Sequence, residues 1–538
     1  MTETVKNLEE EVQCRRTFAI ISHPDAGKTT LTERLLLFGG AIRLAGSIKG
    51  RKTKKYAASD WMEMERQRGI SITSSVLQFS YEGHRINILD TPGHQDFSED
   101  TYRTLAAADS ALMLIDMAKG VEEQTIKLFE VCRMQGIPIF TFINKLDRHG
   151  REPLELLDEI EKVLGIGSWP FNWPAALGFG SYGLYDRRLG QLELHAGGRQ
   201  TETLATSNGQ GLEDPALKNA LDHASYEKLR SEIELLDGAG DDFDLGKVLE
   251  GQLTPVFFGS AISGFGVESF FREFLRLAPP PSEKKSSAGP IDPADPSFSG
   301  FIFKIQANMN PAHRDRIAFL RVCSGEFKRD KTVIHERSGK KVRLTQPQQF
   351  LAQNRDIVEV AYPGDIVGLY DPGLYQIGDT LSEGSSFRFE NLPRFSPELF
   401  AVVTARDAMK YKQFHKGLSQ LAEEGAVQLY KIPGKEEVIL GVVGELQFEV
   451  FQHRLQHEYG LSINLRRIPY RLARWIDEPD QELLSSLRGL VVKDENNDTV
   501  ALFENEFSLE WALKRNPSAN LYTLEEYSNL RKEEQAHS

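Results

Sequence analysis

The sequence has 538 residues, of which 40% are hydrophobic and 26% charged, and its formal net charge is −14. A single hydrophobic core stops growing at about 250–300 residues, so we expect several domains in a globular chain. No apolar run reaches the roughly 18 residues of a membrane span, and the acidic balance argues against indiscriminate coating of nucleic acid while leaving room for a local basic patch.

Residues 12–278 alternate short apolar runs with helical patterns, which predicts a doubly wound α/β domain. The runs are apolar throughout, as expected of parallel strands that are buried on both faces. The spacing of Leu31, Leu35 and Phe38 predicts a helix that ends at the two glycines after it. The expected strands are residues 17–21, 85–89, 111–115, 138–143 and 254–258.

Residues 148–250 separate two of these strands and are too many for a structureless loop. They contain Trp169, Trp173 and a hairpin-like stretch at residues 182–194. We therefore expect an inserted subdomain. The tryptophans are interpreted as core anchors, with a partner-binding site as the alternative.

The rest of the chain changes in pattern twice. Proline-rich residues 279–297 predict an extended linker, and the β-like runs in residues 298–390 predict a β-barrel. Residues 391–538 follow the order strand, helix, two strands, helix, strand, which predicts a ferredoxin-like α+β domain with a frayed polar end after Leu524. The expected elements are residues 300–306, 317–322, 356–360 and 365–369 in the barrel, and residues 399–404, 410–424, 427–430, 438–441, 446–458 and 462–465 in the last domain.

A phosphate-binding loop is predicted between the first strand and the first helix. Gly27 would let the backbone close around a β-phosphate, and Lys28 would place its charge on the β- and γ-phosphates. Thr29 would offer its hydroxyl to Mg²⁺. Ser22 stands where the general pattern has glycine, so a simple tight turn is the alternative for this motif taken alone. The motif consists of Ser22, His23, Pro24, Asp25, Ala26, Gly27, Lys28 and Thr29.

A second motif follows the strand at residues 85–89. Asp90, at the carboxyl end of that strand, can hold Mg²⁺ through water, and Gly93 can offer its N–H to a γ-phosphate. In isolation this pattern more often marks a simple turn. Its position downstream of a predicted phosphate-binding loop favours the nucleotide-binding interpretation. The motif consists of Asp90, Thr91, Pro92, Gly93 and His94.

A third motif would read the nucleotide base. Asp147 can accept from the ring N–H and the amino group of guanine together, a pair of donors that adenine lacks. Asn144 would bridge base and loop, and the stem of Lys145 can stack along the ring. After the last strand, a backbone N–H at Ser260 or Ala261 could contact the guanine oxygen. The base-reading tetrapeptide is Asn144, Lys145, Leu146 and Asp147, and its place after the other two motifs predicts GTP rather than ATP.

At these motifs the sequence resembles the translational GTPases, through residues 22–30 (SHPDAGKTT), 68–73 (RGISIT) and 90–94 (DTPGH). It is still more similar to the class II peptide-chain release factors, including residues 313–319 and 441–447. This resemblance implies a P-loop GTPase domain with an insert, followed by a β-barrel and an α+β ferredoxin-like domain. The implied function is a ribosome-dependent GTPase that promotes dissociation of class I release factors after peptide release.

The resemblance also implies roles for single residues. Lys28 and His94 would be the catalytic residues, with ribosomal RNA positioning His94 to orient the attacking water. A basic run in the expected first switch segment would contact ribosomal RNA or would be a solvated loop; it consists of Lys49, Arg51, Lys52, Lys54 and Lys55. The expected Mg²⁺ ligands are Thr29, Asp90 and one or both of Ser71 and Thr73.

The implied partners are the ribosome, with its RNA and proteins, and class I release factors. The implied cofactors are GTP or GDP and Mg²⁺, and the protein is expected to be a monomer. Three separated cysteines and the lack of a secretory signal predict a cytoplasmic location and no membrane association. Three alternatives remain, of which a metabolic P-loop kinase fits worst, because it would carry a substrate-binding lid and no counterpart of the base-reading residues 144–147. A translocation or ribosome-protection GTPase like elongation factor G would need further domains after Pro469, and a non-hydrolysing GTP-sensing scaffold would need an impaired Lys28 or His94.

Overall fold

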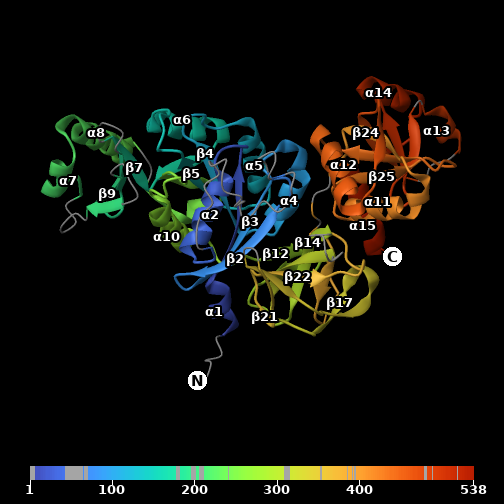
Figure 1. Ribbon diagram of the computed structural model, residues 1–538, viewed down its shortest axis with the longest axis horizontal. Helices are drawn as coiled ribbons and strands as arrows, with labels where there is room; N and C mark the ends of the chain where they lie inside the picture. Colours follow the sequence, from blue (N-terminus) through green and yellow to red (C-terminus); the bar gives the residue numbers. More distant parts are fainter. Residues whose placement is uncertain are drawn as a thin grey trace.

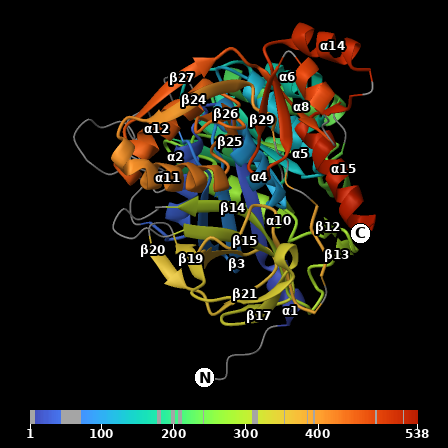
Figure 2. The same ribbon diagram turned by 90° about the vertical axis from the view of Figure 1, so that its right-hand side faces the viewer.

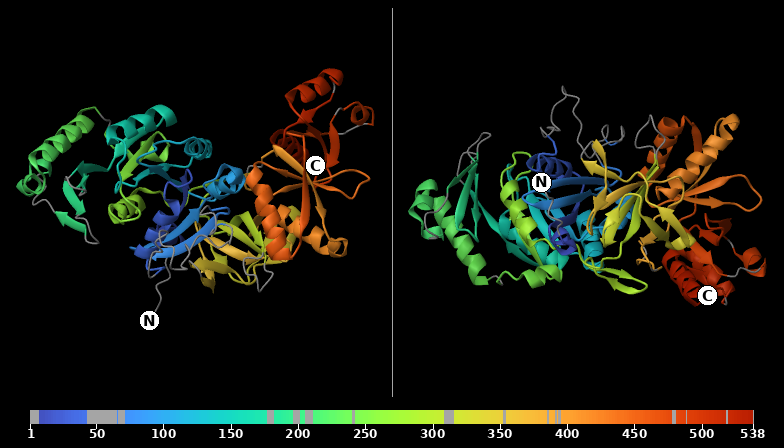
Figure 3. Two further views of the ribbon diagram at one scale, coloured as in Figure 1. Left: turned by 45° about the horizontal axis from the view of Figure 1, so that its top comes forward. Right: turned by 90° about the horizontal axis from the view of Figure 1, so that it is seen from below.

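Three bodies make up the structure, a computed structural model (Figure 1). The α/β domain with its insert runs from blue to green, the barrel is yellow, and the C-terminal domain is orange and red. The C-terminal domain lies above the barrel in Figure 2, and in Figure 3 it lies at the opposite end from the inserted subdomain. The residues that the structure describes are 7–42, 65, 71–176, 182–195, 201–204, 211–239, 242–307, 316–351, 354–384, 386–390, 392, 395–477, 481–487, 489–517 and 519–537.

The α/β domain is built on a mostly parallel sheet in the order β2-β3-β1-β4-β5-β11-β6, with β2 antiparallel at one edge. Its central strands β1, β4, β5 and β11 are buried along their whole length, which explains their apolar runs. The predicted fold class and all five predicted strands are confirmed. The elements are α1 (Leu8–Gln13), β1 (Arg15–Ser22), α2 (Lys28–Phe38), β2 (Ser75–Tyr81), β3 (His84–Asp90), η1 (Gln95–Phe97), α4 (Ser98–Ala106), β4 (Ser110–Asp116), α5 (Glu123–Met134), β5 (Ile139–Asn144), α6 (Pro153–Leu164), β6 (Gly167–Pro170), β11 (Leu253–Phe258) and α10 (Val267–Leu277).

The insert forms a separate antiparallel sheet in the order β10-β9-β8-β7, covered by helices. Trp173 is fully buried and its indole N–H donates to Glu232 at 2.8 Å, while Trp169 packs on Phe171 and Phe243, so both tryptophans act as anchors. The separate sheet begins later than residue 148, because β6 pairs in parallel with β11 of the main sheet. The elements are β7 (Asn172–Ala176), β8 (Tyr182–Asp186), β9 (Gln191–His195), β10 (Thr201–Leu204), η3 (Gly211–Glu213), α7 (Pro215–Ala220), α8 (His223–Ala239) and α9 (Leu245–Leu249).

The second domain is a curved sheet in the order β18-β17-β23-β14-β15-β22-β19-β20, as predicted for a barrel. Two details differ from the sequence prediction. The expected linker carries a short hairpin, β12–β13, and the expected strand at residues 356–360 is divided between β20 and β21. The elements are β12 (Lys284–Ser286), β13 (Gly289–Ile291), β14 (Ser299–Ala307), β15 (Arg316–Ser324), β16 (Phe327–Lys328), β17 (Thr332–His335), η4 (Glu336–Ser338), β18 (Lys340–Arg343), β19 (Gln348–Leu351), β20 (Asn354–Ile357), β21 (Val360–Ala361), β22 (Ile366–Tyr370) and β23 (Thr380–Ser382).

The C-terminal domain continues its ferredoxin-like half into one larger sheet, in the order β27-β24-β26-β25-β29-β30-β28-β31. The end of the chain is not frayed as expected, because Leu524 and Tyr527 are buried and anchor the last helix, α15, on the sheet. The elements are β24 (Leu399–Ala405), η5 (Ala408–Lys410), α11 (Tyr411–Glu423), β25 (Gln428–Lys431), β26 (Val438–Val442), α12 (Glu445–Tyr459), β27 (Ile463–Ile468), β28 (Leu472–Ile476), α13 (Gln481–Ser486), β29 (Leu490–Lys493), β30 (Thr499–Phe503), α14 (Glu506–Arg515), β31 (Leu521–Tyr522) and α15 (Leu524–His537).

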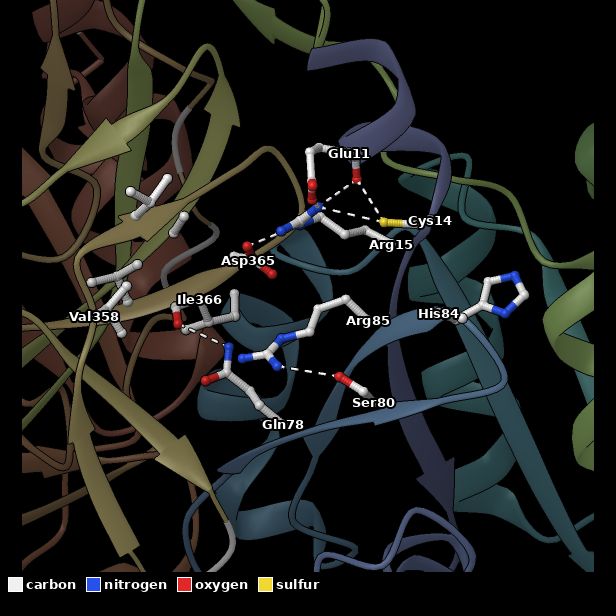
Figure 4. Close-up of a pocket in the computed structure, with 14 residues that line it drawn as sticks. Glu11, Cys14, Arg15, Gln78, Ser80, His84, Arg85, Val358, Asp365 and Ile366 are labelled. Atoms are coloured by element: carbon white, nitrogen blue, oxygen red, sulfur yellow. Dashed lines mark hydrogen bonds and ion pairs between the residues drawn. The ribbon is translucent and has the colours of Figure 1, made fainter. Parts of the chain in front are cut away.

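The α/β domain and the barrel share a polar interface. The Thr17 hydroxyl donates to the carbonyl oxygen of Gly364 at 2.7 Å, and Arg15 pairs with Asp365 at 2.9 Å. A pocket of about 370 Å³ opens beside these contacts. Gln78 and Ile366 both line it, and the Gln78 side-chain amide donates to the carbonyl oxygen of Ile366 at 3.0 Å (Figure 4). Among the helices that the structure describes, none is long and apolar enough to cross a membrane.

Candidate functional site

The predicted phosphate-binding loop joins the end of β1 to the start of α2. Helix α2 begins at Lys28, so its free N–H groups face the loop, as an anion site requires. Gly27 has a φ of 102°, and a β-carbon there would collide with the side-chain amide of Asn144. Ser22, the departure from the general motif, ends β1 with its side chain buried. The loop therefore has the predicted backbone form despite Ser22.

Lys28 and Asp90, both predicted to lie near the phosphates, are in direct contact. The buried Lys28 ammonium donates to Asp90 Oδ1 at 2.7 Å and also to the carbonyl oxygen of Thr91. The Thr91 hydroxyl in turn donates to the carbonyl oxygen of Ile20 at 2.7 Å, which fixes this strand end to β1. Asp90 Oδ2 is buried and has no hydrogen-bond partner among the described residues. This carboxylate oxygen and the hydroxyl of the half-buried Thr29, which follows Lys28 in the chain, are oxygen ligands of the kind that Mg²⁺ prefers.

Asn144 holds the base-reading segments together. Its side-chain amide donates to the carbonyl oxygen of Ala26 at 2.8 Å, and its Oδ1 accepts from the amide of Ala261 at 2.8 Å. Ser260 donates its hydroxyl to Asp147 Oδ1 at 2.5 Å, and the Leu146 amide donates to a backbone carbonyl of the same loop. The phosphate loop and both predicted base-reading segments therefore meet at one place, as the motif order predicted.

Lys145 is held by a residue that the sequence analysis did not single out. Its ammonium donates to Asp116 Oδ2 at 2.6 Å and to the carbonyl oxygen of Asp25 at 2.6 Å. Burial disfavours the Asp116 carboxylate, but the hydrogen bonds from Lys145 and from the Ala118 amide outweigh it and lower the pKa of Asp116. Asp116 is the last residue of β4, at the carboxyl ends of the parallel strands, where the other site residues also lie. This position at a strand end could have identified Asp116 from the sequence.

His94 caps the short helix η1 beside the phosphate site. Its Nδ1 accepts from the backbone amide of Asp96 at 3.3 Å, so in the neutral ring the proton sits on Nε2. Its side chain is half-buried, with the ring centroid 6.2 Å from that of Phe97. Gly93 lies against Pro24 of the phosphate loop, which places His94 next to that loop.

The first switch segment is described only in part. Ser71 and Thr73 are described, and a carboxylate missed in the sequence, that of Glu65, accepts from the amides of Ile72 at 2.9 Å and Thr73 at 3.2 Å. The choice between Ser71 and Thr73 as the metal ligand stays open. The basic run (Lys49, Arg51, Lys52, Lys54 and Lys55) and residues 68–70 and 313–315 lie outside the described residues.

Comparisons with known proteins agree with this arrangement. Residues 13–280 match the family model "Elongation factor Tu GTP binding domain", residues 297–384 match "Elongation factor G domain 2", and residues 389–513 match "Class II release factor RF3, C-terminal domain". A solved structure of a Thermus thermophilus protein matches 87% of this chain and 71% of its own, with a TM-score of 0.69 and 23% identity, which supports the fold.

Curated relatives align over nearly the whole chain. A protein of Symbiobacterium thermophilum named peptide chain release factor 3 is 57% identical over 95% of this chain and 98% of its own length. Proteins with the same name from Listeria monocytogenes and Ligilactobacillus salivarius are 56% and 55% identical, each over 96% of this chain and 99% of their own. The chain therefore belongs to the peptide chain release factor 3 family and is a guanine-nucleotide-binding GTPase of translation termination.

Proposed function

We propose that this GTPase binds the ribosome after peptide release and promotes the dissociation of class I release factors. The observation that carries the proposal is the joint presence of a GTP-binding domain and a C-terminal domain of the release-factor type, in that order on one chain. We further propose that it works in the cytoplasm as a monomer, in contact with ribosomal RNA and proteins. An elongation-factor-G-like translocase is disfavoured because residues 389–513 match the release-factor domain.

At the phosphates we propose that Lys28 contacts the β- and γ-phosphates. Thr29, Asp90 and either Ser71 or Thr73 would hold Mg²⁺, which would neutralise charge on the transferred phosphate. The proximity of Lys28 to the unpartnered Asp90 Oδ2 supports this assignment.

At the base we propose that Asp147 recognises guanine, with Lys145 along the ring and the Ala261 segment at the guanine oxygen. Support comes from the network around Asn144, which holds these segments to the phosphate loop. His94 would orient the attacking water through Nε2, because its Nδ1 already accepts a backbone hydrogen bond. Loss of the γ-phosphate would then release residues 51–73 and 90–101, which would change the contacts that the ribosome reads.

The test follows a labelled class I factor on ribosomal termination complexes. We expect GTP with the wild-type protein to accelerate its dissociation, and ATP to have no effect. The Lys28→Ala variant should lose both GTP binding and the acceleration. Class I dissociation that is unchanged by the wild-type protein with GTP would contradict the proposal, and stimulated tRNA movement on elongating ribosomes would instead support the translocase.

A further inference from the structure

The turn that carries His94 is in contact with the C-terminal domain. Asp96, two residues after His94, is buried, and its Oδ2 accepts from the backbone amide of Leu446 at 2.7 Å. Leu446 lies in the first turn of α12, so the carboxylate sits at the positive end of a long helix. In Figure 1, α12 lies on the side of the C-terminal domain that faces α4, the helix that follows η1.

The fit around Asp96 is close. Gly444, the N-cap of α12, lies directly against its carboxyl group, and a β-carbon at this position would overlap that group. The backbone of Gly444 is extended, with φ −136° and ψ 159°, a conformation that alanine also adopts. The Asp96 side chain, and not the backbone, therefore explains the glycine at this position.

A small apolar cluster surrounds this contact. Ile72 from the end of the first switch segment and Phe97 from η1 pack on Val450 and Leu446 of α12. Phe97 also neighbours the His94 ring. Ile72 and Phe97, the neighbour of His94, are thus both in contact with the C-terminal domain.

We infer that the C-terminal domain positions His94 for hydrolysis, through the contact of Asp96 with Gly444 and Leu446 at the start of α12. The Asp96 backbone amide orients the imidazole by donating to Nδ1. The Asp96 carboxylate is fixed by α12. Movement of α12 relative to the α/β domain would therefore shift the His94 ring. Asp96 is a positioning residue, and this inference rests on the proposed role of His94.

The first experiment measures ribosome-stimulated GTP hydrolysis with Asp96→Ala, Asp96→Asn and Gly444→Ala. Asp96→Ala loses the carboxylate–amide contact and Gly444→Ala displaces it, so each should lower kcat about tenfold or more while KM for GTP changes little. Asp96→Asn keeps an oxygen that accepts from Leu446 and should restore most of kcat. Glu445→Ala is the matched control, because its exposed side chain pairs with Arg467 rather than with the α/β domain.

A double-mutant cycle makes the test specific. In the Asp96→Ala background, Gly444→Ala should have no further effect, since the group it collides with is gone. Additive losses in kcat for the double variant would overturn the positioning role. Wild-type kcat in both single variants, combined with loss of stimulated hydrolysis in His94→Ala, would overturn it too. Either result would leave the proposed function intact. Unchanged hydrolysis in His94→Ala would instead refute the proposed role of His94 itself.

Discussion

The α/β domain makes two contacts of different construction, one with the barrel and one with the C-terminal domain. Toward the barrel, Arg321 pairs with Asp109 at 2.5 Å, both almost fully buried, and Lys284 lies 3.6 Å from the same carboxylate. Toward the C-terminal domain, the contact at the turn that carries His94 consists of the Asp96–Leu446 hydrogen bond and a small apolar cluster.

The difference has a physical consequence. A buried ion pair is costly to break, because either partner left alone is a desolvated charge, whereas one hydrogen bond and a few apolar contacts can be exchanged at low cost. The contact with the barrel is therefore expected to contribute more to stability than the contact at the turn that carries His94.

The largest expected effect is at the barrel contact. Asp109→Ala would leave Arg321 and Lys284 buried without their carboxylate and should lower the free energy of unfolding by about 3–5 kcal/mol. Urea denaturation measures this change in the free energy of unfolding. Asp158→Ala, which removes an exposed carboxylate on helix α6 of the same domain, should change stability by less than about 1 kcal/mol. A loss for Asp109→Ala as small as that of the control would remove the distinction between the two contacts.

A smaller, pH-dependent effect is expected at Lys304, whose ammonium donates to the carbonyl oxygen of Ser74 at 2.6 Å and lies 3.4 Å from Asp100. Burial disfavours the Asp100 carboxylate, but Lys304 and hydrogen bonds from Ser74 outweigh it and lower the pKa of Asp100. Because the folded pKa is depressed, this stabilisation is present above the ordinary pKa of an aspartate and is lost as the pH falls through the folded value.

Lys304→Met should therefore cost about 1.5–3 kcal/mol at neutral pH, and the difference in stability from wild type should narrow as the pH falls below the ordinary pKa of an aspartate. Denaturation of both proteins across that pH range checks the sign. A gap that is constant with pH would mean that Lys304 contributes through packing and its hydrogen bond to Ser74 and not through its pairing with Asp100.

The smallest effect is expected at α12. Glu445→Ala removes an exposed ion pair with Arg467 and should change the free energy of unfolding by less than about 0.5 kcal/mol. Thermal unfolding monitored by calorimetry is the measurement. A loss comparable to that of Asp109→Ala would contradict the expectation that the Glu445–Arg467 pair is a weak surface ion pair.

Features of the fold and the site that depend on local sequence patterns could be predicted from the sequence. Buried parallel strands gave apolar runs, and Asn144 joins the phosphate loop to the Ala261 segment as the motif order led us to expect. The missed residues depend on long-range packing: Asp96 meets Leu446 across 350 positions, and no spacing in either segment signals that contact. The buried last helix was missed because its apolar residues, Leu524 and Tyr527, are few within a polar stretch.

The most direct test of the account is single-round GTP hydrolysis on ribosomes by wild type and His94→Ala. We predict strong ribosomal stimulation for wild type, and for His94→Ala a loss of about a hundredfold or more in rate with GTP and ribosome binding preserved. His94→Ala hydrolysis at the wild-type rate on ribosomes would contradict the account.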